Sequence, residues 1–404
     1  MSTTAKSGLK AKIGICLLMM VMFTQSLVSP GLSAMQASFP TAPTELVQML
    51  STIATLFSAA SILVAPGVRK IGYKKMSILT VVLMFIGALG VAVIGSASFW
   101  GVFVARIIYG IGYGFAFALC VAYCAALFDG KTRSVMFGVM TGAGGICSMI
   151  FSLVAGVLSV IDWTYSFWFM TAFIVVFGAI ALFMLPEPDK QEEAADKDAK
   201  ADAPKKGFSA TFIIMIILCM FGIAAFTSFM NNGAMVIIDA GLGEPAVVGT
   251  VFSAMGAGML VGGFVYGPVK MLFKRFTHPL ILFLFALAFV GFLNITSIPL
   301  FAACAFVFGF AFGMLNPCWQ DILLDKAPGK GDMVSSIFVA TQGIGQFFSP
   351  AVLGGIATLV GFTGVYYQWQ LVTPFLIAAF VIVLVLNIVN KKGKTVAAEE
   401  ATEE

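Results

Sequence analysis

Long runs of apolar residues, separated by short polar connections, repeat along the whole chain. Each run has about 20 residues, the length that an α-helix needs to cross a bilayer. The runs lack the alternation of a membrane β-barrel, and lipid cannot satisfy an open sheet edge. The pattern predicts an all-α membrane protein with about twelve transmembrane helices, at 12–34, 45–66, 76–95, 99–124, 134–159, 164–185, 211–237, 245–268, 279–296, 299–322, 332–358 and 367–389.

Lysine and arginine occupy every second connection. They precede the first run, follow the second, fourth, sixth, eighth and tenth runs, and end the chain, whereas the other connections carry only acidic charges. Because cytoplasmic loops are enriched in Lys and Arg, we expect an even number of spans and both termini in the cytoplasm. Arg106 is the one basic residue outside these connections.

A charged, alanine-rich segment without aromatic residues runs from Glu187 to Gly207, a composition typical of a solvated linker. We expect an N-terminal six-helix bundle at 1–186, a cytoplasmic linker at 187–210, a C-terminal six-helix bundle at 211–390 and a cytoplasmic tail at 391–404. The two bundles share an internal repeat, since "SVMFGVMTGAG" from Ser134 aligns with "SSIFVATQGIG" from Ser335. Repeats of this size are typical of secondary transporters, with a solute site where the halves meet.

The composition supports a membrane protein and excludes several classes of function. Hydrophobic residues make up 60% and charged residues 10% of the chain, and the mean hydropathy is +1.02. The seven cysteines lie in apolar runs without a CxxC pair, and there is a single histidine, so we expect no metal and no cofactor. Without a nucleophile–base pair or a phosphate-binding loop, we expect neither an enzyme nor a nucleic-acid partner.

Two motifs make the chain resemble the major facilitator superfamily. "RIIYGIGYG" from Arg106 is similar to the family's fourth-helix motif, an arginine followed by spaced glycines. "GVRKIGYKK" is similar to the basic cytoplasmic loop between helices 2 and 3, and its motif residues are Gly67, Arg69, Gly72, Lys74 and Lys75. Arg69 stands where the family has Asp, a departure that affects the charge relay latching this loop to its neighbours. The resemblance implies the family's fold of two six-helix bundles.

Arg106 is the first candidate for solute binding. A lipid-facing arginine costs at least ~2.5–3.5 kcal/mol near the bilayer centre, so its guanidinium should face a polar interior. Tyr113 shares its helix face, and Gln25 falls at a similar depth, where its carbonyl can accept a hydrogen bond but cannot cancel the charge. An uncompensated cation predicts binding of an organic anion, most naturally a carboxylate. The alternative is a structural role, with bonds to backbone carbonyls and Gln25.

Other polar residues in the predicted spans are candidates for the same site or for hydrogen bonds between helices. They are Asn231, Asn316, Gln342 and Gln346, of which Gln342 and Gln346 lie one helical turn apart. Asp321 is the one acidic residue within a predicted span, apart from Glu45 and Asp332 at the first position of theirs. It is the candidate for coupling transport to protons, and the alternative is that it only marks a helix end.

These observations favour a secondary active transporter that moves a small organic solute, an anion or carboxylate, by alternating access. The alternative is a proton-coupled efflux antiporter of drugs or hydrophobic metabolites. The fourth-helix motif and the 40 phenylalanines favour it, whereas the Gly-Pro of the antiporters' fifth helix is replaced by Phe151-Ser152. A membrane receptor is a third class, disfavoured because no signalling domain is visible. We expect a monomer in a bacterial inner membrane whose partners are lipid, the solute, and protons or a counter-anion.

Overall fold

The structure, a computed structural model, describes residues 2–57, 64–128, 130–187, 210–326, 331–364 and 366–403. Within these ranges the regular elements are helices, and no strand occurs. Nine helical segments of the described residues are long and apolar enough to cross a membrane. The predicted all-α membrane fold is confirmed.

The first six predicted spans correspond to the helices of the N-terminal half, and their buried side chains share one core. The span at 45–66 is described only in part, because 58–63 lie outside the described residues. The elements are α1 (Ser2–Phe23), η1 (Thr24–Leu27), η2 (Ser29–Gly31), α2 (Leu32–Ser38), α3 (Thr44–Leu56), α4 (Val64–Ile71), α5 (Tyr73–Ile94), η4 (Gly95–Ala97), α6 (Phe99–Leu127), α7 (Gly130–Leu158) and α8 (Thr164–Met184).

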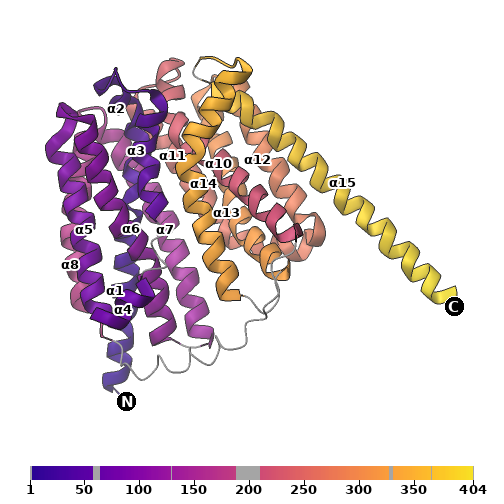
Figure 1. The fold of residues 1–404 in the computed structure, drawn as a ribbon, viewed down its shortest axis with the longest axis horizontal. Helices are drawn as coiled ribbons and strands as arrows, with labels where there is room; N and C mark the ends of the chain where they lie inside the picture. Colours follow the sequence, from indigo (N-terminus) through magenta and orange to yellow (C-terminus); the bar gives the residue numbers. More distant parts are fainter. Residues whose placement is uncertain are drawn as a thin grey trace.

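The last six predicted spans correspond to the C-terminal half, which has its own core. Its elements are α10 (Ala210–Asp239), α11 (Pro245–Phe273), η6 (Lys274–Phe276), α12 (Thr277–Asn294), α13 (Ile298–Lys326), α14 (Gly331–Val360) and α15 (Tyr367–Glu403). The helix α15 runs through the predicted tail, whose Ala, Glu and Lys residues are strong helix formers, and projects away from the bundle (Figure 1). Of the predicted linker, only Glu187 and Ala210 are described.

The two halves lie side by side, with α7 against α11 and α3 against α14 (Figure 1). We call the side of the bundle where α2 meets α3 the upper side, as drawn in Figure 1, and the opposite side, where α1 begins, the lower side. Close contact between the halves requires glycine near the upper end of α7. A Cβ atom on Gly156 would lie only 2.5 Å from the Cα atom of Gly249 on α11.

Glycine pairs also bring α11 and α13 together inside the C-terminal half. A Cβ atom on Gly258 would overlap the carbonyl oxygen of Phe306, and one on Gly309 would overlap the carbonyl oxygen of Met255. Small residues at such crossings allow two membrane helices to pack backbone against backbone. The C-terminal half is therefore built on a tight α11–α13 contact.

Candidate functional site

Arg106 is completely buried on α6, with 0% of its surface exposed. Its Nε donates a hydrogen bond to the carbonyl oxygen of Leu50 at 2.8 Å, and its Nη2 donates to Oε1 of Gln25 at 2.6 Å. The guanidinium carbon lies 4.7 Å from the ring centroid of Tyr109. Nη1 has no hydrogen-bond partner, and no described carboxylate lies within ion-pair distance of the guanidinium. The site therefore holds a buried positive charge with an unused donor.

Gln25 reaches Arg106 from a break in the first membrane span. The α-helix stops at Phe23, and two short 3₁₀ segments follow. Pro30, in the second of these, lacks the amide hydrogen that would continue the α-helical ladder. The side chain of Gln25 bridges two elements, because its Nε2 also donates to the carbonyl oxygen of Ser51 on α3 at 2.5 Å.

Ser51 extends this network into the C-terminal half. Its Oγ donates to Oδ1 of Asn231 on α10 at 2.5 Å. Asn231 is 1% exposed, and its Nδ2 has no hydrogen-bond partner among the described residues. The structure thus brings Arg106, Gln25 and Asn231, three of the residues singled out in the sequence, into one buried network that crosses between the halves.

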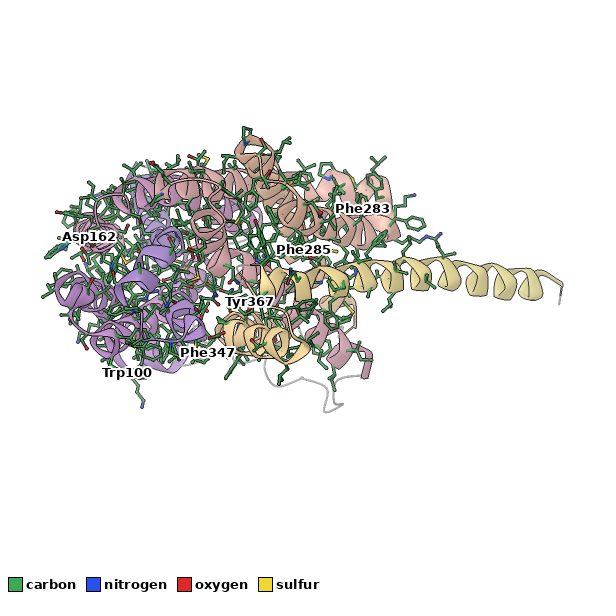
Figure 2. All side chains as sticks on the ribbon, turned by 90° about the horizontal axis from the view of Figure 1, so that it is seen from above. Trp100, Asp162, Phe283, Phe285, Phe347 and Tyr367 are labelled. Carbon is green, nitrogen blue, oxygen red and sulfur yellow. The ribbon has the colours of Figure 1, made fainter. Side chains whose placement is uncertain are left out.

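A second set of bonds joins the halves one helical turn away, through three buried amides that we call the amide triangle: Gln48, Asn232 and Gln368. Gln48 Nε2 donates to Asn232 Oδ1 at 2.7 Å, Asn232 Nδ2 donates to Gln368 Oε1 at 2.7 Å, and Gln368 Nε2 donates to Gln48 Oε1 at 3.1 Å. Gln368 Nε2 also donates to the hydroxyl of Tyr367, which donates to Glu45 Oε1 at 3.3 Å. Tyr367 lies near the middle of the molecule, between the halves (Figure 2).

Of the remaining predicted solute-site residues, Tyr113 lies beside the ring that Arg106 contacts, and the others lie elsewhere. Tyr113, on α6, is partly buried and stacks on Tyr109, with 6.5 Å between the ring centroids. Gln342 on α14 donates to Asn316 Oδ1 on α13 at 2.8 Å, and Gln346 lies one turn further along α14. The hydrogen bonds of the described residues do not connect this α13–α14 pair to Arg106.

Asp321 lies near the end of α13, five residues before Lys326. Its Oδ2 accepts hydrogen bonds from Lys270 Nζ at 2.7 Å and from the hydroxyl of Tyr266. Both partners come from α11. Asp321 is therefore part of an ion pair within the C-terminal half and does not contact Arg106.

The basic loop between the second and third spans has a carboxylate partner that the sequence did not reveal. Glu187, three residues after the end of α8, accepts hydrogen bonds from the backbone amides of Tyr73 at 2.8 Å and Lys74 at 2.7 Å. These amides open α5, where a negative charge is favourable. Gly72 has φ +88°, and a Cβ atom there would lie 2.5 Å from Glu187 Oε1. Glu187 thus supplies an acid beside a loop in which Arg69 replaces the family's Asp.

The other loop-motif residues lie on the two helices that flank Gly72. Gly67 and Arg69 belong to α4, and the side chains of Lys74 and Lys75 are exposed at the start of α5.

Sequence reasoning missed most of the residues that connect the halves. One signal was present: Gln48, Thr52 and Thr55 recur at helical spacing in a span that should cross lipid, so they had to face protein. Gln368 gave no comparable signal, because it lies in the first turn of its helix and no polar residue follows it three, four or seven positions later, at the spacing of one helical face.

The fold and the buried polar network between its halves define a polytopic membrane transporter. The sequence profile of the Major Facilitator Superfamily matches residues 14–231 and 217–403. The chain belongs to this superfamily, and it is a multi-pass secondary transporter rather than an enzyme.

The following relatives share little sequence identity with this chain. Multidrug resistance protein 1 of Bacillus subtilis (strain 168) is 25% identical over 181 residues, a match that spans only 44% of this chain and 44% of that protein. The crystal structure of the human organic anion transporter MFSD10 (TETRAN) matches with a TM-score of 0.63 and 15% identity, over 95% of this chain and 100% of that chain. The D-xylose-proton symporter structure matches with a TM-score of 0.67 and 16% identity, over 94% and 97%. At such identities, the structural matches show the fold alone.

Proposed function

We propose that this transporter carries a small organic anion, of which a carboxylate is the simplest case, and that Arg106 binds it. The observation that supports this proposal is the buried guanidinium without a carboxylate partner among the described residues. A charge kept in a protein interior is costly unless it is paired and hydrogen-bonded. A carboxylate solute would supply the missing negative charge and an acceptor for the unpartnered Nη1.

Access to Arg106 requires the halves to separate at the upper side. The hydrogen bond between Ser51 and Asn231 and the amide triangle all link α3 to the C-terminal half. When these bonds break, the unpartnered Nδ2 of Asn231 becomes available to the same solute as the guanidinium. We therefore propose Arg106, Gln25 and Asn231 as the core of the binding site, with Tyr113, Asn316, Gln342 and Gln346 as further contacts along the pathway.

Substitution of Arg106, measured as solute uptake by proteoliposomes, tests this proposal. An anion carrier should lose uptake with both Arg106→Ala and Arg106→Lys, because an ammonium group cannot reproduce two parallel hydrogen bonds to a carboxylate. Lys10→Ala, which removes an exposed cation outside the loop motif, is the matched control and should transport normally. Uptake by Arg106→Ala at the parental rate would contradict the proposal.

The solute class is tested separately by binding. A ligand that binds the folded protein raises its melting temperature, so purified protein is screened with carboxylates, amines and dyes. We expect stabilisation by carboxylates that disappears in Arg106→Ala. Stabilisation by hydrophobic amines and dyes alone would instead support an efflux antiporter, the function suggested by the partial match to Multidrug resistance protein 1.

Asp321 is our candidate for coupling transport to protons. Its ion pair with Lys270 would have to open before the carboxylate could take up a proton. We expect Asp321→Asn to abolish accumulation driven by a pH gradient while preserving exchange of solute without a gradient. If gradient-driven accumulation is unchanged in this variant, coupling runs through another group, such as the carboxyl group of the solute.

We further propose that the lower side faces the cytoplasm of a bacterial cell, with both termini on that side, a linker at 187–210 between the two bundles, and a monomeric carrier. The basic residues of alternate connections support this orientation. Tags at the two termini should both be protected in intact cells from a reagent that does not cross the membrane, and labelling of either would contradict the orientation.

A further inference from the structure

The lower ends of α11, α12, α13 and α15, together with η6, line a half-open cavity of about 380 Å³. Its lining includes Tyr266, Lys270, Lys274, Arg275, Asp321 and Asn387. None of these residues belongs to the Arg106 network. We propose that this cavity binds the phosphate headgroup of an anionic phospholipid.

The charges of the cavity favour an anion. Three cations, Lys270, Lys274 and Arg275, face one carboxylate, Asp321, which Lys270 already pairs at 2.7 Å. Among the described residues, no carboxylate lies within ion-pair distance of Lys274 or Arg275. A phosphate group would neutralise this excess charge, and its oxygens would accept bonds from both side chains.

The level of the two cations in the membrane points to a lipid rather than a dissolved anion. Met271, Leu272 and Phe273 immediately precede Lys274 and are 73%, 76% and 40% exposed. Apolar side chains this exposed belong among acyl chains, so the following two cations lie at the level of the headgroups. The three-residue η6 joins α11 directly to α12, and Lys274 itself adopts φ +49°. The cations are thus held on a tight turn.

The surface beside the cavity can accommodate the acyl chains. Phe283 on α12 and Phe380 on α15 lie with ring centroids 5.5 Å apart, which joins the two helices that border the cavity. Phe283 is 43% exposed and lies on the part of the C-terminal half that is remote from the N-terminal half (Figure 2). A phospholipid whose headgroup enters the cavity can therefore extend its chains along an apolar face.

Lipid binding by the full-length protein in neutral detergent tests the proposal. The melting temperature is followed during titration with dioleoylphosphatidylglycerol, with dioleoylphosphatidylcholine and glycerol phosphate as comparison probes, and affinity follows from the shift. The double variant Lys274→Gln/Arg275→Gln should bind phosphatidylglycerol about 25-fold more weakly, because each cation near an anionic lipid contributes a factor of about five. The control Lys74→Gln/Lys75→Gln removes two exposed cations from the other half and should keep the parental affinity.

Three results would overturn the proposal. An unchanged affinity of Lys274→Gln/Arg275→Gln would mean that the cavity is not the site. An equal loss in both double variants would mean that phosphatidylglycerol is attracted by overall charge. Stabilisation by glycerol phosphate as strong as that by phosphatidylglycerol would mean that the cavity takes a free anion and not a lipid.

Discussion

Removal of Gln48 tests whether the amide triangle holds the halves together at the upper side. Gln48→Ala deletes two amide–amide bonds between the halves, the one donated to Asn232 at 2.7 Å and the one accepted from Gln368 at 3.1 Å, and a weak contact of Nε2 with Sδ of Met235 at 3.8 Å. Asn232 and Gln368 remain bonded to each other at 2.7 Å, so both keep a partner. The substitution therefore weakens the contact between the halves and leaves the C-terminal half intact.

The size of the effect follows from the number of bonds lost. A side-chain hydrogen bond between membrane helices contributes about 0.6 kcal/mol on average and up to about 1.7 kcal/mol. Gln48→Ala loses two such bonds, and the former partners stay paired with each other. We therefore expect it to weaken the closed contact between the halves by about 1–2 kcal/mol. These bonds exist only when the upper ends are together, so the ratio of separated to closed molecules should rise about 5- to 30-fold.

Pulsed electron–electron spin resonance between the upper ends of the two halves measures this ratio. Spin labels on Ile161→Cys, beyond the end of α7, and Ala246→Cys, in the first turn of α11, report the separation in a background without native cysteines. Ile161 is 70% exposed, so a label there should not disturb packing. We expect Gln48→Ala to shift the distance distribution toward longer values.

Gln36→Ala is the matched control, because Gln36 Nε2 donates at 3.2 Å to the carbonyl oxygen of Ala42 within the same half. It should leave the distribution unchanged. A parental distribution in Gln48→Ala, or an equal shift in Gln36→Ala, would refute the reasoning that these amides close the upper side.

Further predictions concern packing and capping. Gly309→Ala should destabilise the protein by at least about 1–3 kcal/mol, because the added Cβ atom overpacks α13 against α11. Gly267→Ala is the control, since a Cβ atom there would have no neighbour within 4 Å among the described residues, and thermal unfolding should show no loss of stability. Glu187→Gln should reduce the free energy of unfolding by about 1 kcal/mol, because α5 loses a negative charge at its N-terminus, and this is measured as a slightly lower melting temperature. An unchanged melting temperature would argue against capping of α5 by Glu187. Gly249→Leu should separate the upper ends more than Gln48→Ala does, because its side chain would overlap the backbone of α7. Spin-label distances no longer than in the parental protein would contradict the close approach of α11 to α7.

Part of this architecture could be read from the sequence because partition into lipid depends on each segment alone. The length and hydrophobicity of the runs were enough to predict the membrane helices, and the position of Arg106 among them predicted a charge that must be shielded. The helical repeat also placed Gln25 at a depth similar to that of Arg106, and the two side chains are hydrogen-bonded at 2.6 Å.

The connections between distant segments were decided by the tertiary structure. Gln48 and Gln368 are 320 residues apart in sequence and form a hydrogen bond, and Glu187 caps a helix that begins 114 residues earlier. Hydrophobicity is summed along one segment, but a hydrogen bond depends on the distance between two atoms to within a few tenths of an ångström. That distance is set by the packing of all the helices at once, so no local pattern of residues could specify which polar groups meet.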